Sequence, residues 1–383
     1  MSSETAPAHL RDLPTPCLVV DKAKLLANAA RMTARMKALG VVHRPHLKTV
    51  KSVPVAKLLV GETGAVTVST LKEAEEFAAA GFKDILYAVG IAPQKLPRVT
   101  ALRRRGAGLK IILDSVDAAE AVARHANETG DAIPALIEID VDGHRAGVPL
   151  SEKHRLVEIG RILDASKAEL AGVLTHAGES YALSDPDALT KFAERERAGA
   201  VAMADTLRAA GLPCPIVSVG STPTSLAAAG LDGVTEVRSG VYAFFDLVQA
   251  GIGVCAVEDI AMSVLATVIG RQRHKGWVLT DAGWMALSSD RGTSGQETDQ
   301  FYGLVCDEAG APFGDLVVIR ASQEQGTVAL RPGAGGAVPD FAVGDRLRIL
   351  PNHACNTAAQ HARYYAIDGD GNVTDVWERF GGW

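Results

Sequence analysis

Short β-branched segments alternate with longer helical patterns from the N-terminus to about residue 240, and this alternation restricts the fold more than any other feature. Segments of this kind, separated by helices, are typical of βα units around a parallel sheet. Nine segments follow the pattern: 17–20, 41–44, 65–68, 85–88, 110–113, 136–140, 172–175, 216–219 and 236–238. A closed (β/α)8 barrel uses eight strands, so one segment is surplus, and the first precedes the regular alternation. We therefore predict an α/β protein whose (β/α)8 barrel spans residues 22–250.

Several of the expected helices begin at recognisable capping residues. Thr70 is followed three residues later by Glu73, which predicts a capping box. Ser115 and Ser151 are predicted N-caps of two further helices, because a serine hydroxyl can accept a hydrogen bond from a free N–H of the first turn. These starts strengthen the alternation of strands and helices.

The sequence changes character after Cys255, where β-rich segments follow one another between Gly, Asp and Pro turns. These segments are 261–269, 277–280, 316–320, 327–330, 346–350, 364–367 and 373–377. A run of strands without intervening helices predicts a separate all-β domain. We expect this domain to span residues 251–383 and to include the surplus strand within residues 1–21.

The composition excludes several kinds of partner. The 39 basic and 45 acidic side chains leave a net charge of −6, too small and too evenly spread to indicate binding to nucleic acid. No apolar run approaches the roughly 20 residues that cross a bilayer, and the first residues lack the apolar core of a signal peptide. Five widely separated cysteines without CxxC spacing do not indicate a disulfide framework. These features predict a cytoplasmic protein with a small-molecule substrate.

The loops after the last two barrel strands hold residues that suit a phosphate group. Catalytic groups of such barrels gather at the C-terminal ends of the strands, and phosphate often lies at strands seven and eight. Gly220, Ser221 and Thr222 follow the seventh strand, and Gly240 follows the eighth. Either loop alone is more typical of a simple turn. The two adjacent loops together favour a phosphate site made from backbone N–H groups and hydroxyls.

Lys48 follows the first barrel strand and therefore belongs to the same mouth. A lysine in an apolar mouth loses hydration, which favours its neutral amine as a nucleophile and base. Taken alone, Lys48 is more typical of the protein surface, as are Lys51 and Lys57. A phosphate site facing this lysine instead indicates pyridoxal 5′-phosphate, bound as a Schiff base.

Nine stretches carry a resemblance to a known family, in an order that spans nearly the whole chain. They are TPCLVVD, RPHLKT, STLKEAE, EIDVDGHRAGV, THAGESY, SVGSTPT, RSGVYAFFD, DAGWMALSSD and PNHACNT. With them the chain resembles the fold-type III pyridoxal phosphate enzymes, in the group of D-threonine aldolase and D-serine dehydratase. The resemblance implies an alanine-racemase-like barrel, a C-terminal β domain, and usually a homodimer with active sites at its interface.

The resemblance also implies roles for individual residues. Lys48 in RPHLKT resembles the Schiff-base lysine, and Arg145 in DGHRAGV is similar to the arginine that faces the pyridine nitrogen. A charged guanidinium there would discourage protonation of that nitrogen and weaken the ring as an electron sink. His176 and Tyr181 resemble residues beside the cofactor ring. The residues that resemble the phosphate site are Ser221, Thr222, Gly240 and Val241.

The stretch PNHACNT places an imidazole and a thiol two positions apart, at His353 and Cys355. This ligand pair suits Zn²⁺, although a lone His-x-Cys is more typical of a buried pair without a metal. The aldolases typically have a His-Cys-Asp stretch here that binds Mn²⁺ or Mg²⁺. The stretch in this chain instead resembles that of the zinc-dependent dehydratases of D-serine and D-threo-3-hydroxyaspartate. Gln325 stands where relatives often have a histidine, which leaves the substrate specificity open.

The predicted reaction is dehydration of a D-3-hydroxyamino acid, namely D-serine, D-threonine or D-threo-3-hydroxyaspartate, to a 2-oxo acid and ammonia. Lys48 would remove the Cα proton while Zn²⁺ helps the β-hydroxyl to leave, so the two must lie within a substrate's length. The alternatives are a metal-dependent D-threonine or D-3-hydroxyamino acid aldolase, which breaks Cα–Cβ, and a non-catalytic pyridoxal phosphate-binding protein. A racemase would need a second acid–base residue, for which Tyr302 has no matching motif. Asp281 and Asp290 are expected either to face a neighbouring subunit's site or to cap turns.

Overall fold

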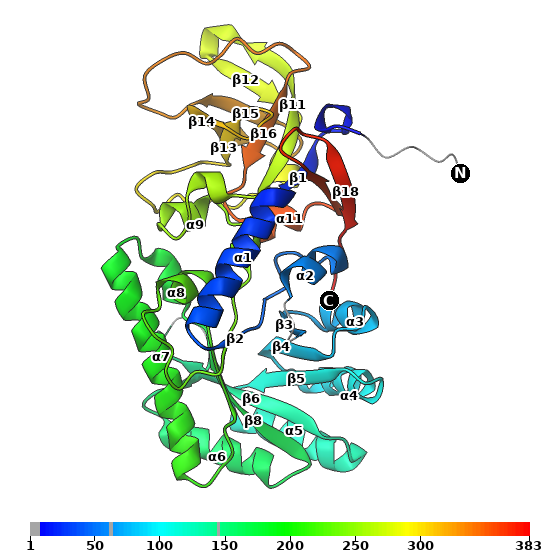
Figure 1. Ribbon diagram of the computed structural model, residues 1–383, viewed down its shortest axis with the longest axis vertical. Coiled ribbons are helices and arrows are strands. Elements are labelled where there is room, and N and C mark those ends of the chain that lie inside the picture. Colours follow the sequence, from blue (N-terminus) through cyan, green and yellow to red (C-terminus); the bar gives the residue numbers. More distant parts are fainter. Residues whose placement is uncertain (1–7, 61–63, 144–145) are drawn as a thin grey trace, which may run out of the picture. The chain divides into compact units, whose positions relative to one another are not determined.

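The computed structural model describes residues 8–60, 64–143 and 146–383, and Figure 1 shows the course of the chain. The chain forms two compact units. The barrel unit comprises Arg31–Gly240 with Gly382–Trp383, and the β unit comprises Met1–Ala30 with Val241–Gly381. The β unit is therefore assembled from segments that lie on both sides of the barrel unit in the sequence.

Eight parallel strands form the ring of the barrel unit, in the order β2-β10-β9-β8-β6-β5-β4-β3. They are β2 (Val42–His43), β3 (Ala65–Val68), β4 (Asp84–Gly90), β5 (Gly108–Leu113), β6 (Ile133–Asp140), β8 (Ala168–Thr175), β9 (Ile216–Val219) and β10 (Glu236–Val237), with β7 (Val148–Pro149) paired to β6. A parallel bridge between His46 and Thr67 nearly closes the ring between β2 and β3. The N–H of Leu47 donates to the carbonyl of Thr67 there at 2.8 Å. The predicted parallel barrel is confirmed.

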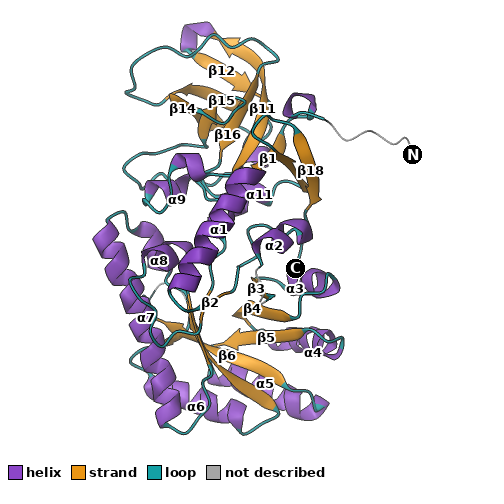
Figure 2. Ribbon diagram, viewed as in Figure 1, coloured by secondary structure: helices purple, strands orange, loops and turns teal. Residues whose placement is uncertain are grey.

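Helices alternate with the strands along the chain (Figures 1 and 2). They are α1 (Lys22–Ala38), α2 (Val53–Leu59), α3 (Leu71–Ala79), α4 (Leu96–Arg104), α5 (Val116–Thr129), α6 (Lys153–Asp164), α7 (Pro186–Ala209) and α8 (Thr222–Ala227). The hydroxyl of Thr70 accepts from the N–H of Glu73 at 3.0 Å, and Ser115 caps α5 in the same way. The prediction for Ser151 is wrong, because a turn closed by the N–H of Glu152 on the carbonyl of Pro149 occupies that position.

Charged side chains form a connected network inside the barrel. The buried Arg44 follows β2, and its Nε donates to Oε2 of Glu236 on β10 at 2.8 Å. Its Nη2 donates to Oδ2 of Asp84 on β4 at 2.9 Å, and Nζ of Lys110 on β5 donates to Oδ1 of the same carboxylate at 2.6 Å. Arg44 therefore ties β2 to other strands close to the point where the ring is held by a single bridge.

The β unit contains a closed antiparallel barrel extended by further strands. The strand β12 pairs with both β15 and β11, which closes the ring β11-β12-β15-β14-β13-β16. The strand β1 joins this sheet, antiparallel to β11 and parallel to β17. The strands are β1 (Cys17–Asp21), β11 (Met262–Gln272), β12 (Trp277–Thr280), β13 (Leu304–Cys306), β14 (Pro312–Ala321), β15 (Gly326–Leu330), β16 (Arg346–Leu350), β17 (Arg363–Ile367) and β18 (Val373–Glu378). Three short helices accompany them: α9 (Leu247–Gly251), α10 (Trp284–Leu287) and α11 (Ala354–Ala358).

The cysteines of the chain are free thiols, in agreement with the sequence pattern. Burial raises the pKa of Cys17 to about 12, and burial likewise raises that of Cys306 to about 12. Both thiols are therefore protonated and unreactive at neutral pH. In the part of the chain that the structure describes, no helix combines the length and apolar character needed to cross a bilayer.

Candidate active site

Four neighbouring strands of the barrel unit end at residues that the sequence analysis selected. His176 follows β8, Ser221 lies two residues after β9, Gly240 lies three residues after β10, and Lys48 lies five residues after β2. Since β8, β9, β10 and β2 are consecutive in the ring, these residues lie in neighbouring loops at one end of the barrel. Arg145 falls outside the described residues. Val241 is buried and begins the β unit.

Lys48 lies at the end of a segment that backbone hydrogen bonds hold in place. The N–H of His46 donates to the carbonyl of Ser239 at 2.8 Å, and Leu47 is held by Thr67. Within the described residues Nζ of Lys48 makes no hydrogen bond or ion pair, whereas Nζ of Lys51 lies 3.3 Å from the carboxylate of Glu73. The side chain of Lys48 is exposed, which differs from the expectation that a lysine in the barrel mouth loses its hydration.

The two glycines of the predicted phosphate site allow loops to pack closely on each other. A Cβ at position 240 would lie 2.6 Å from the carbonyl oxygen of His46. Gly220 has φ +129°, and a Cβ there would lie 2.5 Å from the carbonyl oxygen of Arg238. Because L side chains rarely adopt this φ, glycine is required at position 220 by conformation as well as by space. Both glycines thus bring the loops after β9, β10 and β2 together.

Ser221 begins helix α8, and its hydroxyl is committed to local hydrogen bonds. Its Oγ accepts from the N–H of Thr224 at 3.2 Å, and the Thr224 hydroxyl accepts from the N–H of Ser221 at 3.2 Å. The same Oγ lies 3.0 Å from the hydroxyl of Ser180. Ser221 and Thr222 are both buried. The side chain of Ser221 therefore shapes the start of α8, where backbone N–H groups gather.

His176 and Tyr181 lie close together in the loop after β8. Their ring centroids are 6.5 Å apart, with an angle of 48° between the planes. Nδ1 of His176 lies 3.0 Å from the carbonyl oxygen of Gly220. Because a carbonyl only accepts, Nδ1 must carry the proton of this hydrogen bond. The ring is thereby fixed to the loop that begins α8.

Sequence reasoning missed Glu196, which joins the same loops from helix α7. Its carboxylate is fully buried, and Oε1 accepts from the N–H of Ala177 at 3.1 Å and from the N–H of Gly220 at 3.0 Å. These hydrogen bonds lower the pKa of Glu196, but burial outweighs them and raises it. The available signal was its place on the helical face of Ala193 and Ala200, where a carboxylate needs a buried partner.

The two predicted metal ligands lie together in the β unit, in the turn after β16. His353 immediately precedes α11, and Cys355 is the second residue of that helix. The Cys355 side chain hydrogen-bonds to the imidazole of His353, and Nδ1 of His353 lies 3.1 Å from Oδ2 of Asp290. Burial alone would lower the pKa of His353, but the hydrogen bonds with Asp290 and Cys355 outweigh it and raise that pKa to about 11.

Two further residues, which sequence reasoning did not select, hold this turn in place. The buried Asp246 accepts from the N–H of Ala354 at 2.9 Å and from the N–H of Gln249 at 2.9 Å, and burial raises its pKa. The side-chain amide of Asn352 donates to the backbone carbonyl of Asp290 at 3.0 Å. The turn that carries His353 and Cys355 is therefore fixed on both sides. Both residues lie in stretches used for the family resemblance, RSGVYAFFD and PNHACNT.

The donor set fits a zinc ion with open coordination positions. Imidazole nitrogen and thiolate sulfur are typical zinc ligands. Among the described residues, no group of three or more His, Cys, Asp or Glu side chains is arranged to hold a metal. A zinc ion at this pair would take two ligands from the described residues, and its other positions would be open to water or substrate.

The remaining polar candidates have local roles. Asp281 accepts from the N–H of Thr267 at 2.7 Å and from the hydroxyl of Thr15 at 2.6 Å, so it joins segments that are distant in sequence. The guanidinium carbon of Arg291 lies 5.1 Å from the centroid of the Tyr302 ring.

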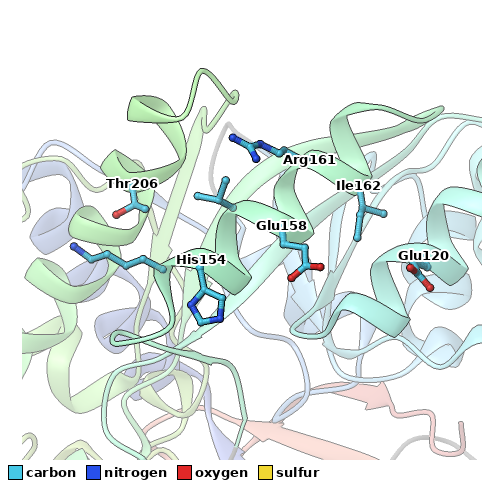
Figure 3. A pocket seen from close by; sticks show the side chains of 8 residues that line it. Glu120, His154, Glu158, Arg161, Ile162 and Thr206 are labelled. Atoms are coloured by element: carbon cyan, nitrogen blue, oxygen red, sulfur yellow. The ribbon is translucent and has the colours of Figure 1, made fainter.

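Figure 3 shows a separate open groove on the barrel unit. It is lined from α5, α6 and α7 by Glu120, Lys153, His154, Val157, Glu158, Arg161, Ile162 and Thr206, none of which the sequence analysis selected.

A parallel barrel with its candidate groups at the strand ends, followed by a β domain with a histidine–cysteine pair, defines an enzyme of the alanine racemase fold class. Comparison with known families agrees. The family "Alanine racemase, N-terminal domain" matches residues 20–248, and the family "Putative serine dehydratase domain" matches residues 261–367. The chain belongs to this alanine-racemase-like family and carries its serine dehydratase type of second domain.

Dehydratases and aldolases are among the similar relatives. The D-threo-3-hydroxyaspartate dehydratase of Delftia sp. (strain HT23) is 57% identical over 98% of this chain and 99% of its own length. The D-serine dehydratase of Dictyostelium discoideum is 30% identical over 96% of this chain and 97% of its own. Aldolases are also similar: the D-threonine aldolase of Arthrobacter is 28% identical over 96% of this chain and 93% of its own length. Dehydratases and aldolases are both lyases, and this chain is a lyase of the same family.

Solved structures give the same result. The Delftia dehydratase superposes with a TM-score of 0.95 at 56% identity, covering 98% of this chain and 100% of that one. A cysteine-to-alanine variant of a D-threo-3-hydroxyaspartate dehydratase, described as metal-free, is 57% identical with a TM-score of 0.95, covering 98% and 100%. The D-threonine aldolase of Filomicrobium marinum is 26% identical with a TM-score of 0.82, covering 98% of both chains.

Proposed function

We propose that the protein is a pyridoxal phosphate- and Zn²⁺-dependent dehydratase, which converts D-threo-3-hydroxyaspartate, D-serine or D-threonine to a 2-oxo acid and ammonia. The 57% identity to a D-threo-3-hydroxyaspartate dehydratase over 98% of this chain supports this reaction. The structural observation that carries the proposal is the contact between His353 and Cys355. A nitrogen and a sulfur donor held together in this way suit Zn²⁺ better than Mn²⁺ or Mg²⁺, which prefer oxygen ligands.

The pyridoxal phosphate is proposed to bind at the mouth of the barrel unit. Lys48 would hold its aldehyde carbon, since Nζ has no competing partner among the described residues. The residues proposed beside the ring are Arg145, His176 and Tyr181, and those proposed beside the phosphate are Ser221, Thr222, Gly240 and Val241. The ring of His176, the start of α8 and the close loops at Gly220 and Gly240 suit this assignment.

The proposed elimination needs both a carbanion-stabilising cofactor and a Lewis acid. When bound, pyridoxal phosphate supplies an electron sink for the negative charge at Cα, and Zn²⁺ supplies a Lewis acid for the β-hydroxyl. Nζ of Lys48, once the substrate's amine has replaced it on the cofactor, would take the proton from Cα. The Cβ–O bond would break with its electron pair on oxygen, which would leave as water after taking a proton. Hydrolysis of the unsaturated amine would give the 2-oxo acid and ammonia, and His353 and Cys355 would hold the cation.

A product assay tests this function directly. Purified holoenzyme is incubated with D-serine, D-threonine and both D-3-hydroxyaspartate diastereomers, with and without a chelator, and ammonia and 2-oxo acid are compared with glycine and aldehyde or glyoxylate. Dehydration predicts ammonia and 2-oxo acid in equal amounts. Formation of both products should stop on chelation and resume when Zn²⁺ is added back. Glycine with aldehyde or glyoxylate, without ammonia, would show an aldolase. Retained cofactor absorbance with neither set of products would show a binding protein.

Two lysine variants sharpen the assay. Lys48→Ala is expected to lose both the cofactor absorbance of the imine and the ammonia production. Lys57→Ala is the matched control, because Lys57 is an exposed lysine on the adjacent helix α2. The homodimer implied by the family resemblance belongs to the same proposal, and sedimentation equilibrium of the holoenzyme tests it.

A further inference from the structure

We propose that Asp290 is a positioning residue for the metal site, whose carboxylate holds Nδ1 of His353 so that Nε2 of the same ring binds the cation. This inference rests on the proposed function, because it assumes that His353 and Cys355 are metal ligands. It adds a residue that contacts neither the cation nor the substrate. All of the contacts that support it lie within the β unit.

The carboxylate of Asp290 is fixed by three hydrogen bonds. Oδ2 lies 3.1 Å from Nδ1 of His353 and accepts from the side-chain amide of Asn356 at 2.5 Å. Oδ1 accepts from the N–H of Gly292 at 2.7 Å. The backbone carbonyl of Asp290 also receives the amide of Asn352, the residue directly before His353. Asp290 is thus joined to the metal-binding turn by both its side chain and its backbone.

The direction of the hydrogen bond decides which nitrogen can bind a metal. An ionised carboxylate only accepts, so Nδ1 of His353 must carry a proton toward Asp290. The lone pair of the neutral ring is then on Nε2, on the other side of the imidazole. A carboxylate behind a metal-bound histidine fixes the tautomer and orientation of the ring, and also makes the ligand more basic. Asp290 is in the position that this role requires.

A direct ligand role for Asp290 does not fit the same geometry. Its Oδ2 is already bonded to Nδ1, whereas the metal must be on Nε2. The described residues contain no group of three His, Cys, Asp or Glu side chains arranged to hold a metal, which agrees with two protein ligands. Asp281 is a suitable control residue in the same unit. Its carboxylate also accepts two hydrogen bonds, but from Thr267 and Thr15.

Metal affinity, measured separately from activity, tests the proposal. Wild type and the Asp290→Ala, Asp290→Asn and Asp281→Asn variants are purified with pyridoxal phosphate, stripped with a chelator, and titrated with Co²⁺ and Zn²⁺. The sulfur-to-cobalt charge-transfer absorption reports the Cys355–metal bond, and the d–d bands report the ligand geometry. We expect Asp290→Ala to weaken metal binding by about 10- to 100-fold. Asp290→Asn should weaken it less, because the amide oxygen can still accept from Nδ1, and Asp281→Asn should leave it unchanged.

The outcomes separate this inference from the proposed function. Asp290→Ala with an unchanged dissociation constant and unchanged cobalt bands would overturn the positioning role while leaving the metal site intact. Equal losses in Asp290→Asn and Asp281→Asn would assign the effect to general destabilisation and also overturn it. Wild type that binds neither metal would instead overturn the metal in the proposed function. If Asp290→Ala does not fold, the comparison of Asp290→Asn with Asp281→Asn still decides.

Discussion

The guanidinium of Arg44 donates two parallel hydrogen bonds to the carboxylate of Asp84, from Nη1 to Oδ1 at 3.0 Å and from Nη2 to Oδ2 at 2.9 Å. This bidentate geometry is the strong form of a charged pair. Arg44 is buried and lies four residues before Lys48, on the side of the ring that a single backbone bridge completes. The pair therefore contributes to barrel closure at the segment that carries Lys48.

We predict that Arg44→Met destabilises the protein, because Glu236 would lose its buried cation. Removal of one partner from a buried pair typically costs about 3–5 kcal/mol. Urea denaturation at neutral pH measures the loss. Arg98→Met is the control, since Arg98 pairs with Glu75 at a more exposed position. Equal stability of the two variants would contradict the role assigned to Arg44.

The same pair predicts a pH dependence. Burial alone would raise the pKa of Asp84, but hydrogen bonds and charges from Arg44 and Lys110 outweigh it and lower that pKa below its usual 3.8. A depressed pKa stabilises the fold above the unfolded value, and this contribution is lost as the pH falls through the folded pKa. Urea denaturation from about pH 5 down to about pH 2 should therefore show a smaller loss of stability in Asp84→Asn than in wild type. Parallel curves would contradict this prediction.

Gly240 gives a prediction about packing next to Lys48. A Cβ at this position would lie 2.6 Å from the carbonyl of His46, so Gly240→Ala must move the segment that ends at Lys48. We expect a destabilisation of about 1–3 kcal/mol, as for other overpacked sites, together with weaker retention of pyridoxal phosphate after dialysis. Gly230→Ala is the matched control, because its Cβ would meet open space. Retention equal to that of the control would contradict the prediction.

Much of this architecture is visible in the sequence because β-branched segments alternate with helical patterns that have recognisable starts. All nine β-branched segments became strands, and the helices between them begin at Thr70 and Ser115 as their hydroxyls predict. The strands that were missed, β7 (Val148–Pro149) and β13 (Leu304–Cys306), are too short to show any alternation. Their existence depends on neighbours supplied by the sheet, which a local pattern does not contain.

Within the candidate site, too, local features could be predicted from the sequence, whereas contacts between distant segments could not. The predicted ligand pair His353 and Cys355 is local in sequence, so the proximity of the two side chains could be anticipated, and they do interact in the structure. Asp290 and Asp246 reach the same turn from 63 and 108 residues away, and only the fold brings them there. Glu196 was missed for the same reason, because its partners Ala177 and Gly220 belong to different loops.

Glu196 predicts a difference between two substitutions. Its carboxylate receives two backbone N–H groups from the loops that carry His176 and Ser221, so Glu196→Ala would leave both donors buried without a partner. Each such loss costs about 1–3 kcal/mol. Glu196→Gln keeps an acceptor oxygen and should lose clearly less stability in thermal denaturation. If the two variants behave alike, the hydrogen bonds of Glu196 do not hold these loops.

Metal binding should release a proton from His353. Without metal the hydrogen bonds with Asp290 and Cys355 raise the pKa of His353 to about 11, so the ring is protonated at neutral pH. Because this folded-state pKa lies above the usual 6.5, the proton stabilises the metal-free fold below pH 6.5, and that contribution is lost as the pH rises toward 11.

A cation on Nε2 must displace this proton from His353, so zinc affinity should rise with pH. Calorimetric titration of the chelated holoenzyme with Zn²⁺, in buffers of different ionisation enthalpy, counts the protons released. We expect at least about one per ion in wild type and fewer in His353→Gln, whereas a binding enthalpy independent of the buffer would contradict the assignment.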